Sequence, residues 1–137
     1  MSECVFCKIV AGEIPSTKVH EDELTLAFMD IGEVNPGHVL VSVKQHVENL
    51  FGLDDELAAA VFRTAARVAR AQKKAYSPDG VTLYQANGAA AGQTVYHFHL
   101  HLVPRYADDG MRLRWPVQNP PRAQLEANAA RLRAAFD

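Results

Sequence analysis

The chain has 137 residues, of which 48% are apolar and 22% charged, and its formal net charge is −2. These values are typical of a single globular domain with its own core, and they exclude a broad electrostatic attraction to nucleic acid or to an anionic membrane. The first residues do not combine a basic start with an apolar run, and no apolar stretch approaches the roughly 20 residues of a membrane span, so we expect a cytoplasmic protein.

The two cysteines, Cys4 and Cys7, form a C-x-x-C pair. In a reducing compartment this spacing indicates metal or redox chemistry rather than a structural disulfide. A thioredoxin-like motif would follow a strand, and nothing precedes Cys4, so zinc is the better interpretation. Two cysteines are half of a tetrahedral site, and the other ligands would be distant histidines, with His20, His46 and His97 as candidates. The alternative is two small apolar residues near a flexible terminus.

Apolar stretches between turn signals predict a helical turn over residues 5–14 and strands over residues 16–21, 24–30 and 38–44. Asp30 ends the second of these strands, shortly before the Asn-Pro-Gly turn at residues 35–37. A carboxylate in this place can accept hydrogen bonds from sugar hydroxyls, although a lone Asp there is more often a turn or cap residue.

A long helix is predicted over residues 54–76, with acidic residues in its first turn and lysines near its last, as the helix dipole favours. One stripe of this helix is apolar until its last position: Leu57, Val61, Ala65, Val68 and Gln72. We therefore expect it to cover a sheet, and it is also a candidate packing surface for another subunit.

A fourth strand is predicted over residues 81–86, and a loop rich in glycine and alanine follows at residues 87–94. Its small residues allow the backbone to approach a ligand closely, and Asn87, Gln93 and Thr94 add neutral hydrogen-bonding groups. The loop lacks the Gly-Lys-Ser/Thr ending of a P-loop. Beside a histidine cluster it is a candidate for the oxyanion side of a phosphate site.

Half of the six histidines fall within five residues, where they alternate with apolar residues: His97, Phe98, His99, Leu100, His101 and Leu102. The alternation predicts a strand over about residues 95–104 with all three imidazoles on one face, roughly 6–7 Å apart. A merely half-buried strand would use Thr, Lys or Glu more readily than three titratable rings. The sequence therefore favours a functional role for this strand.

Two chemistries fit three imidazoles on one face. Histidines at i and i+2 can chelate zinc and leave a position open for activated water. Alternatively, a neutral imidazole attacks phosphorus while a second one protonates the leaving group. His99, with a neighbour on each side, suits the nucleophile, and the crowding of the rings should keep some of them neutral near pH 7.

After residue 105 the sequence predicts an irregular segment and then a last helix opened by Pro120-Pro121, with Leu125, Ala129, Leu132 and Phe136 on one face. The arginines of this region are interpreted as a solvated face rather than as a nucleic-acid patch. No repeat or second domain is visible. We expect one domain over residues 1–137, with a C-terminal extension over about residues 106–137.

Taken together, the motifs resemble the histidine-triad (HIT) family, in particular the bacterial-type zinc-bearing branch of the histidine triad nucleotide-binding proteins. The matching stretches are Cys4-Val5-Phe6-Cys7-Lys8-Ile9-Val10-Ala11-Gly12-Glu13-Ile14-Pro15, Ala27-Phe28-Met29-Asp30-Ile31, Asn35-Pro36-Gly37-His38, Asn87-Gly88, Gly92-Gln93-Thr94-Val95, His97-Phe98-His99-Leu100-His101-Leu102-Val103 and Pro104-Arg105. Only the segment after Arg105 is poorly covered. The resemblance implies an α+β fold, in which an antiparallel sheet of about five strands carries one long helix, and a homodimer with a continuous sheet.

The resemblance also implies binding of purine mononucleotides and hydrolysis at the α-phosphate through a nucleotidyl-histidine intermediate. His99 matches the nucleophile, His101 a triad partner near the leaving group, and His38 a histidine that supports the triad. The phosphate and leaving-group contacts match Asn87, Gln93 and Thr94. The ribose carboxylate matches Asp30, and the residues around the base match Phe6, Ile9, Ile14, Phe28 and Ile31.

In the zinc-bearing branch, the C-x-x-C pair, a histidine before the long helix and the first triad histidine complete a tetrahedral site. The matching residues are Cys4, Cys7, His46 and His97, which implies a structural zinc, no organic cofactor, and chemistry that stays with His99. One position departs from the family, whose members often have Ser where Thr94 stands. We expect the added methyl group to affect leaving-group preference.

The leading hypothesis is a nucleoside phosphoramidase-like hydrolase, acting for instance on adenosine 5′-monophosphoramidate. The nearest alternative is a dinucleoside polyphosphate hydrolase. Two further classes stay open: a zinc-stabilised nucleotide-binding or interaction module with little turnover, and a metallohydrolase whose zinc is held by His97, His99 and His101. As partners we expect an AMP-like purine nucleotide and a second copy of the chain, and neither nucleic acid nor membrane.

Overall fold

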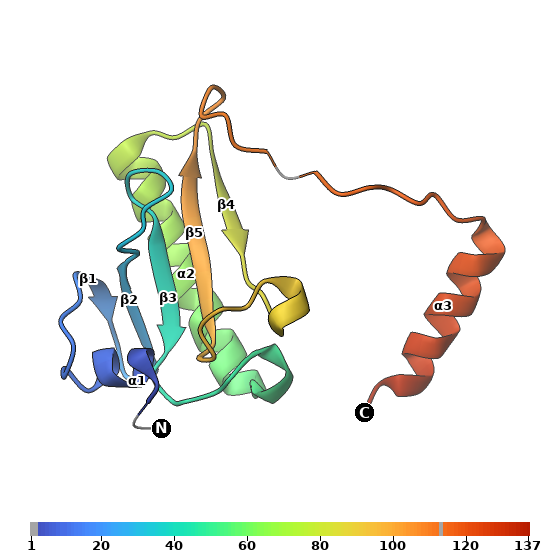
Figure 1. The fold of residues 1–137 in the computed structure, drawn as a ribbon, viewed down its shortest axis with the longest axis horizontal. Coiled ribbons are helices and arrows are strands. Elements are labelled where there is room, and N and C mark those ends of the chain that lie inside the picture. Colours follow the sequence, from blue (N-terminus) through green and yellow to red (C-terminus); the bar gives the residue numbers. More distant parts are fainter. Residues whose placement is uncertain (1–2, 113) are drawn as a thin grey trace.

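Five strands form one antiparallel sheet in the computed structural model, which describes residues 3–112 and 114–137 (Figure 1). The elements in chain order are α1 (Val5–Val10), β1 (Lys18–Glu21), β2 (Thr25–Met29), β3 (Val39–Val43), α2 (Asp55–Tyr76), β4 (Gly80–Tyr84), β5 (His99–Arg105) and α3 (Arg122–Ala135). The spatial order of the strands is β1-β2-β3-β5-β4, so β1 and β4 are the edges. This confirms the predicted α+β fold. Among the described residues, no helix has both the length and the apolar character needed to cross a membrane.

Helix α2 covers one face of the sheet and contacts strands β2 to β5. Its first turn is capped by the carboxylate of Asp54, which accepts a hydrogen bond from the backbone N–H of Leu57 at 2.8 Å. It ends at Ser77, whose left-handed backbone (φ 48°) closes the last turn. The predicted stripe is buried along its whole length: Leu57, Val61, Ala65, Val68 and Gln72. The helix therefore has the core-covering role expected from its sequence.

The sheet separates two apolar clusters. The larger one lies between α2 and the sheet, and it includes Leu100 and Leu102 of β5. The smaller one lies against α1 and consists of Phe6, Ile9, Leu26, Phe28 and Leu40. Because side chains alternate along a strand, His99 and His101 face the α1 side. The side chains of His99 and His101 therefore lie on the face of the sheet opposite α2.

Strand β5 begins at His99, four residues later than the expected start at residue 95. The backbone N–H of Phe98 donates to the carbonyl oxygen of Val47 at 2.7 Å, which lies beyond the end of β3. The chain therefore bends before it joins the ladder, and His97 sits in that bend, fully buried. A period-2 pattern does not reveal such a bend, because the bend depends on a distant partner.

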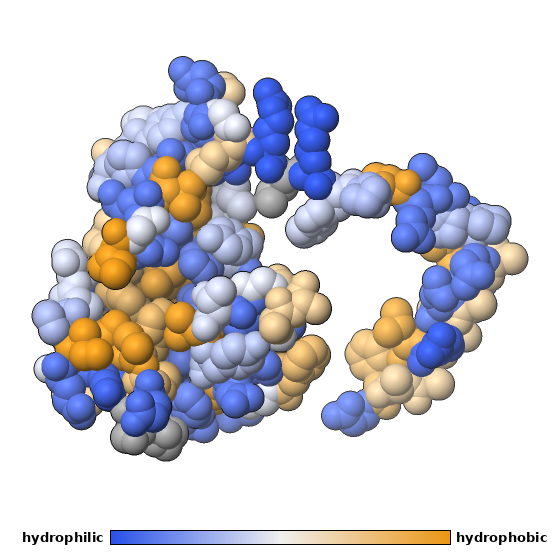
Figure 2. All heavy atoms as spheres, in the orientation of Figure 1, coloured by the Kyte–Doolittle hydropathy of each residue, from blue (hydrophilic) through white to orange (hydrophobic). Residues whose placement is uncertain are grey.

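After β5, the chain that leads away from the sheet is fixed by the hydrogen bonds of Arg105. The guanidinium of Arg105 binds the carboxylate of Asp109 with two hydrogen bonds, of 2.8 and 3.2 Å, and donates to the carbonyl oxygen of Met111 at 2.7 Å. An extended arm then leads to α3, which stands apart from the body of the molecule (Figures 1 and 2). Leu125 and Leu132 of its predicted apolar face are exposed, and so is Phe136, which follows the helix as its C-cap.

Candidate functional site

A cavity of about 370 Å³ opens between α1, the end of β2 and the start of β5, on the face of the sheet away from α2. A smaller hollow of about 50 Å³ adjoins it and shares Thr94, His99 and His101 as walls. The predicted residues that line these two spaces are Phe6, Ile9, Phe28, Asp30, Ile31, Gln93, Thr94, His99 and His101. On this side of the molecule, hydrophobic side chains gather around α1 (Figure 2). The fold thus brings together segments that are up to 95 residues apart in sequence.

Two of the expected nucleotide contacts, Asn87 and Ile14, are not among the described residues that line these spaces. The side-chain oxygen of Asn87 accepts a hydrogen bond from the backbone N–H of Leu50 at 2.7 Å, and its amide nitrogen donates to Gln85 at 2.6 Å. Ile14 packs against the small apolar cluster. In this structure the side chains of Asn87 and Ile14 are engaged with neighbouring protein groups rather than with the two spaces.

The amide of Gln93 is also committed to the protein. Its nitrogen donates to the carbonyl oxygens of Glu48 (2.7 Å) and Val95 (3.1 Å), and its oxygen accepts from the backbone N–H of Gly88 at 2.7 Å. These bonds tie the glycine-rich loop to the segment before α2. The loop is therefore held in place before any ligand binds.

Tyr84 is a site residue that the sequence did not indicate. Its ring lies parallel to the imidazole of His101, at an interplanar angle of 5° and a centroid distance of 4.2 Å. The two residues are direct partners in the β4–β5 ladder. Only the strand register reveals this contact, because Tyr84 by itself is an ordinary strand residue.

The orientation of His99 follows from one short hydrogen bond. Its Nδ1 atom lies 2.6 Å from the carbonyl oxygen of His97. A carbonyl oxygen can only accept, so Nδ1 carries the hydrogen and the neutral ring keeps its lone pair on Nε2. The ring of Phe6 packs edge-on against the imidazole of His99, with the ring centroids 4.8 Å apart. Burial lowers the pKa of His99, against the opposing effects of the His97 carbonyl and of Asp30, and this favours the neutral ring near pH 7.

A chain of hydrogen bonds sets the tautomer of His101 in the same way. The backbone N–H of Val34 donates to Nδ1 of His38 at 3.2 Å, so the hydrogen of the neutral His38 ring is on Nε2. That Nε2 lies 3.0 Å from Nδ1 of His101 and therefore donates to it. The hydrogen of neutral His101 is then on its own Nε2, on the opposite edge of the ring. The carboxylate of Asp30 lies 3.4 Å from His38 and 3.8 Å from His101.

Burial is the main cause of the shifted pKa values in this group. It lowers the pKa of His38, against the charges of Asp30 and Glu33. Burial also lowers the pKa of His101 to about 4, with further lowering by His99 and His38 and partial compensation by Asp30. The imidazoles of His38, His99 and His101 are therefore neutral near pH 7. A neutral imidazole has the free lone pair that nucleophilic attack needs, and it still carries one N–H that can donate.

The four residues of the implied zinc site also come together. Sγ of Cys4 lies 3.3 Å and Sγ of Cys7 3.6 Å from Nδ1 of His97, and Sγ of Cys7 lies 3.3 Å from Nδ1 of His46. Zinc bonds of about 2.0–2.3 Å in a tetrahedron place neighbouring ligand atoms at separations of roughly 3.3–3.8 Å. The four ligand atoms therefore fit one zinc ion.

The hydrogen bond of His97 supports the same conclusion. Its Nε2 lies 2.6 Å from the carbonyl oxygen of Val43, so Nε2 carries the hydrogen and Nδ1 offers its lone pair to the cysteines. Metal-binding histidines commonly donate their other N–H to a backbone carbonyl in this way. Burial, with Cys4 as a further cause, raises the pKa of the Cys7 thiol; a bound cation would reverse this effect.

His20 does not belong to this cluster, although the sequence left it open as a ligand. It lies on β1 with its Nε2 atom 3.4 Å from the carboxylate of Asp22. Of the three triad rings, His97 directs a nitrogen at the cysteines, while His99 and His101 line the cavity. Within residues 3–112 and 114–137, the side chains close enough to share an ion are the cysteine–histidine set and Asp30, His38 and His101; the three triad histidines do not form such a set.

A five-stranded antiparallel sheet that carries a histidine cluster on one face points to the class of histidine-triad proteins, and the neighbouring cysteine–histidine set matches the one expected for their zinc-bearing branch. The HIT domain matches residues 11–108, which is most of the chain. The chain therefore belongs to the HIT family.

Relatives and solved structures agree with this assignment. The chain is 48% identical to Protein hit of Bacillus subtilis over 113 residues, which cover 82% of this chain and 78% of the relative. It is 39% identical to adenosine 5′-monophosphoramidase hnt1 of Schizosaccharomyces pombe over 114 residues, covering 82% and 83% of the two chains.

Two crystal structures of similar proteins support the assignment, one by its fold and one by its bound zinc. A HIT family protein from Bacillus anthracis shares 40% identity and superposes with a TM-score of 0.94 over 98% of both chains. A zinc-bound histidine triad family protein from Mycobacterium smegmatis shares 36% identity with a TM-score of 0.77, over 98% of this chain and 99% of that one. The cysteine–histidine cluster thus occurs in a family in which zinc binding has been observed.

Proposed function

We propose that this protein hydrolyses nucleoside phosphoramidates, that is, purine nucleoside monophosphates joined through the α-phosphorus to an amine. The observation that carries the proposal is the pair of opposite tautomers in the cavity: a lone pair on Nε2 of His99 beside an N–H on Nε2 of His101. A nucleophile and a hydrogen-bond donor stand side by side, with ring centroids 5.1 Å apart. The similarity to an adenosine 5′-monophosphoramidase supports the substrate class.

In the proposed reaction, Nε2 of His99 attacks the α-phosphorus and the bond between phosphorus and the amine nitrogen breaks. The negative charge of the bound phosphate raises the pKa of His101, which takes up a proton and delivers it from Nε2 to the departing amine. Water then attacks the nucleotidyl-histidine, gives its proton to His101 and releases the nucleoside monophosphate. The net consumption is one water molecule, and both histidines return to their starting state once His101 has lost the proton it first took up.

In this proposal the cavity of about 370 Å³ beside α1 holds the nucleoside. Asp30, which directly follows β2, would accept hydrogen bonds from the ribose hydroxyls. Its Oδ1 already accepts a hydrogen bond from the backbone N–H of Gly32 at 2.8 Å. Phe6 and Ile9 of α1 form an apolar wall for the base together with Phe28, and the exposed side chain of Ile31 lies at the mouth. Thr94, which lines both the cavity and the adjoining hollow beside His99, would contact the phosphate oxygens.

Zinc has a structural part in this proposal. Cys4 is the N-cap of α1, and Cys7 lies within that helix, so the metal would fasten the base wall to His46 and to the segment before β5. A closed set of four protein ligands leaves no position for substrate or water. We further propose that two copies pair through β4, the edge strand next to β5, which is open in the single chain.

Mass spectrometry under denaturing conditions tests the function. The protein is mixed with adenosine 5′-monophosphoramidate, quenched within milliseconds and digested at neutral or mildly alkaline pH, because a phosphorus–imidazole bond is acid-labile. The proposal expects an adenylyl group on the peptide that contains His99. A zinc-stabilised module that only binds nucleotides would show saturable AMP binding without any adduct or turnover, and this result would overturn the proposal.

A further inference from the structure

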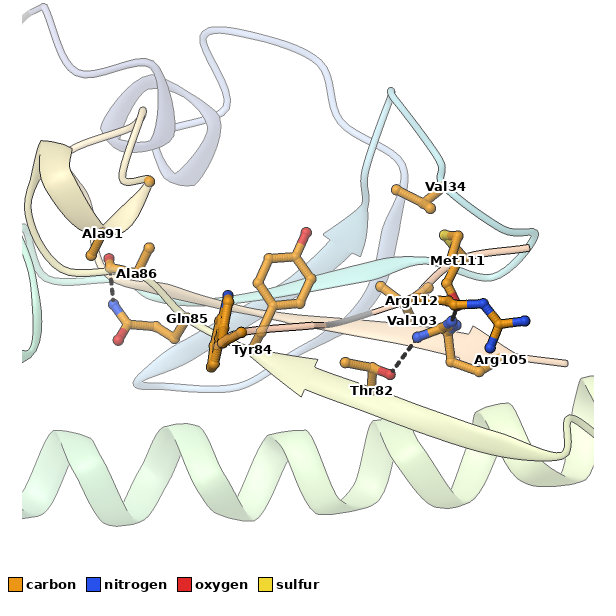
Figure 3. A pocket seen from close by; sticks show the side chains of 12 residues that line it. Val34, Thr82, Tyr84, Gln85, Ala86, Ala91, Val103, Arg105, Met111 and Arg112 are labelled. Carbon is orange, nitrogen blue, oxygen red and sulfur yellow. Dashed lines mark hydrogen bonds between the residues drawn. The ribbon is translucent and has the colours of Figure 1, made fainter. Parts of the chain in front are cut away.

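Tyr84 touches the histidine cluster through its ring, which is stacked on His101. The two rings are parallel within 5°, and their centroids lie 4.2 Å apart. The two residues are direct partners in the β4–β5 ladder, a position that brings side chains on one face close together. Figure 3 shows the Tyr84 side chain standing up from β4 on the side of the sheet away from α2. The phenol ring therefore covers one face of the His101 imidazole.

The hydrogen bond of His101 acts on the edge of the ring and not on its face. Nδ1 of His101 lies 3.0 Å from Nε2 of His38, and this contact sets the tautomer. The χ2 torsion of a histidine is broad, so a ring that is held at one atom can still tilt. Such a tilt would swing the opposite Nε2–H away from a bound substrate. The stack on Tyr84 opposes the tilt because it fixes the plane of the ring.

The stack also affects the charge of His101. In the proposed reaction this ring is positively charged between taking up a proton and delivering it to the amine. The groups that face it are the carboxylate of Asp30, at 3.8 Å, and the rings of His38, His99 and Tyr84. Asp30 favours the charged form, whereas burial and the two neighbouring histidines oppose it. The face of an aromatic ring attracts a cation within about 6 Å of its centroid, so Tyr84 favours the charged form as well.

Tyr84 is separate from the space that is proposed to hold the nucleoside. It lines the small hollow that also contains Thr94, His99 and His101. It is not among the described residues that line the cavity beside α1. A change at this position should therefore affect the chemical step and leave nucleotide binding intact. The ring also borders an open cavity of about 460 Å³, which leaves room for a larger aromatic side chain.

We propose that Tyr84 is a positioning residue of this hydrolase, which fixes the plane of His101 and stabilises the imidazolium that forms during the reaction. The inference rests on the proposed phosphoramidase function and adds to it a residue that acts through His101 rather than on the substrate. Burial and the charge of Asp30 raise the pKa of the Tyr84 hydroxyl, so the phenol stays neutral near pH 7. The role therefore belongs to the aromatic face and does not need the hydroxyl group.

Two variants separate the aromatic face from the bulk of the side chain. Tyr84→Phe keeps the ring, and kcat for adenosine 5′-monophosphoramidate should stay within about twofold of wild type. Tyr84→Leu keeps an apolar side chain without an aromatic face. Its kcat should fall about three- to tenfold while KM stays within about twofold, because the lost contact concerns the charged form of His101.

NMR titration of the AMP complex gives a second measurement that does not depend on turnover. The His101 signal is identified as the one that His101→Gln removes. The midpoint of its titration should lie about half a pH unit lower in Tyr84→Leu than in Tyr84→Phe, because the imidazolium loses its aromatic neighbour. Tyr84→Trp, which has room in the open cavity, should give a midpoint at least as high as that of wild type.

Leu83→Ala is the matched control. Leu83 precedes Tyr84 on β4 and is equally exposed (41% and 42%), but it pairs with Leu102 on the face of the sheet that α2 covers. It should leave kcat and the His101 midpoint unchanged, and it reports any effect that comes from disturbing the edge strand. The loss caused by Tyr84→Leu should also be the same for the phosphoramidates of ammonia and ethylamine, because a positioning residue does not touch the amine.

The proposal is overturned if Tyr84→Phe is as slow as Tyr84→Leu, or if the two variants share one His101 midpoint. A loss that depends on the amine, or an equal loss in Leu83→Ala, would overturn it as well. Each of these results leaves the hydrolase proposal standing. A wild-type protein that binds AMP without hydrolysing the phosphoramidate would overturn the hydrolase proposal instead, and the NMR comparison would then still decide whether the stack stabilises charged His101.

Discussion

The carbonyl oxygen of His97 lies 2.6 Å from Nδ1 of His99, so the first histidine of the triad fixes the tautomer of the second. The same residue binds Val43 through Nε2 and turns Nδ1 toward Cys4 and Cys7. His97 thus contacts the ring of His99 through its backbone and the two cysteines through its side chain. In the proposed function, this residue connects the zinc ligands to the nucleophile, which lies two positions further along the chain.

His99→Ala is expected to abolish turnover of adenosine 5′-monophosphoramidate, with a loss of at least about a thousandfold in kcat, because the covalent step loses its nucleophile. The dissociation constant for AMP should change less than about fivefold, since the base and ribose walls come from α1 and β2. Stopped-flow kinetics and calorimetric titration measure the two quantities. Undiminished hydrolysis by the variant would show that another group attacks phosphorus.

His38→Leu is expected to lower kcat by about ten- to a hundredfold with little change in KM, because His101 loses the donor that fixes its tautomer. His38 is a positioning residue in this scheme, so His38→Gln should recover part of the rate. A glutamine amide can accept from the N–H of Val34 and donate to His101. If the leucine and glutamine variants are equally slow, the effect comes from packing of this buried side chain rather than from the hydrogen-bond chain.

Much of this architecture follows from local patterns. The stripe of α2 and its capping Asp54 specify the long helix, and the cavity residues follow from the HIT resemblance. Three features could not be predicted from the sequence because each depends on a tertiary contact. The start of β5 depends on the hydrogen bond from Phe98 to Val47, and the stacking of Tyr84 on His101 depends on the strand register. The side chain of Asn87 accepts a hydrogen bond from the backbone of Leu50. A sequence motif can name such residues, but it does not contain the partner that decides how each one is used.

Binding of AMP is expected to raise the pKa of His101. In the free protein, burial and the neighbouring histidines lower this pKa to about 4. A phosphate anion in the adjacent hollow stabilises the charged imidazolium, so the midpoint of its titration should move upward by one unit or more. NMR titration of the histidine Cε1–H signals, with and without AMP, measures the shift, and His101→Gln identifies the signal. An unchanged midpoint would remove His101 as the proton donor to the leaving group.

Wild-type protein is expected to contain one zinc ion per chain, and Cys7→Ser to lose it and melt at a lower temperature. A structural zinc contributes directly to folding free energy, so removing one ligand from the closed site weakens the fold around α1. KM should rise as well, because α1 carries Phe6 and Ile9. Elemental analysis and calorimetry measure metal content and melting. His20→Ala is the control, since His20 lies beside Asp22 outside the cluster, and it should keep its zinc.

Gln72→Leu is expected to destabilise the protein by about 1–3 kcal/mol, although leucine suits a helix and a core. The side-chain amide of Gln72 donates to the carbonyl oxygens of Gly37 (2.8 Å) and Leu102 (3.0 Å), and the side chain is buried. Leucine would leave two buried carbonyl groups with one partner fewer each, and this desolvation penalty is larger than the gain from added apolar contact. Urea unfolding measures the change, with Arg67→Leu on the exposed face of α2 as a control expected within about 0.5 kcal/mol of wild type. Equal stability of Gln72→Leu and wild type would mean that these carbonyl groups find other donors. The hydrogen bonds of Gln72 would then not be what holds α2 to the turn before His38.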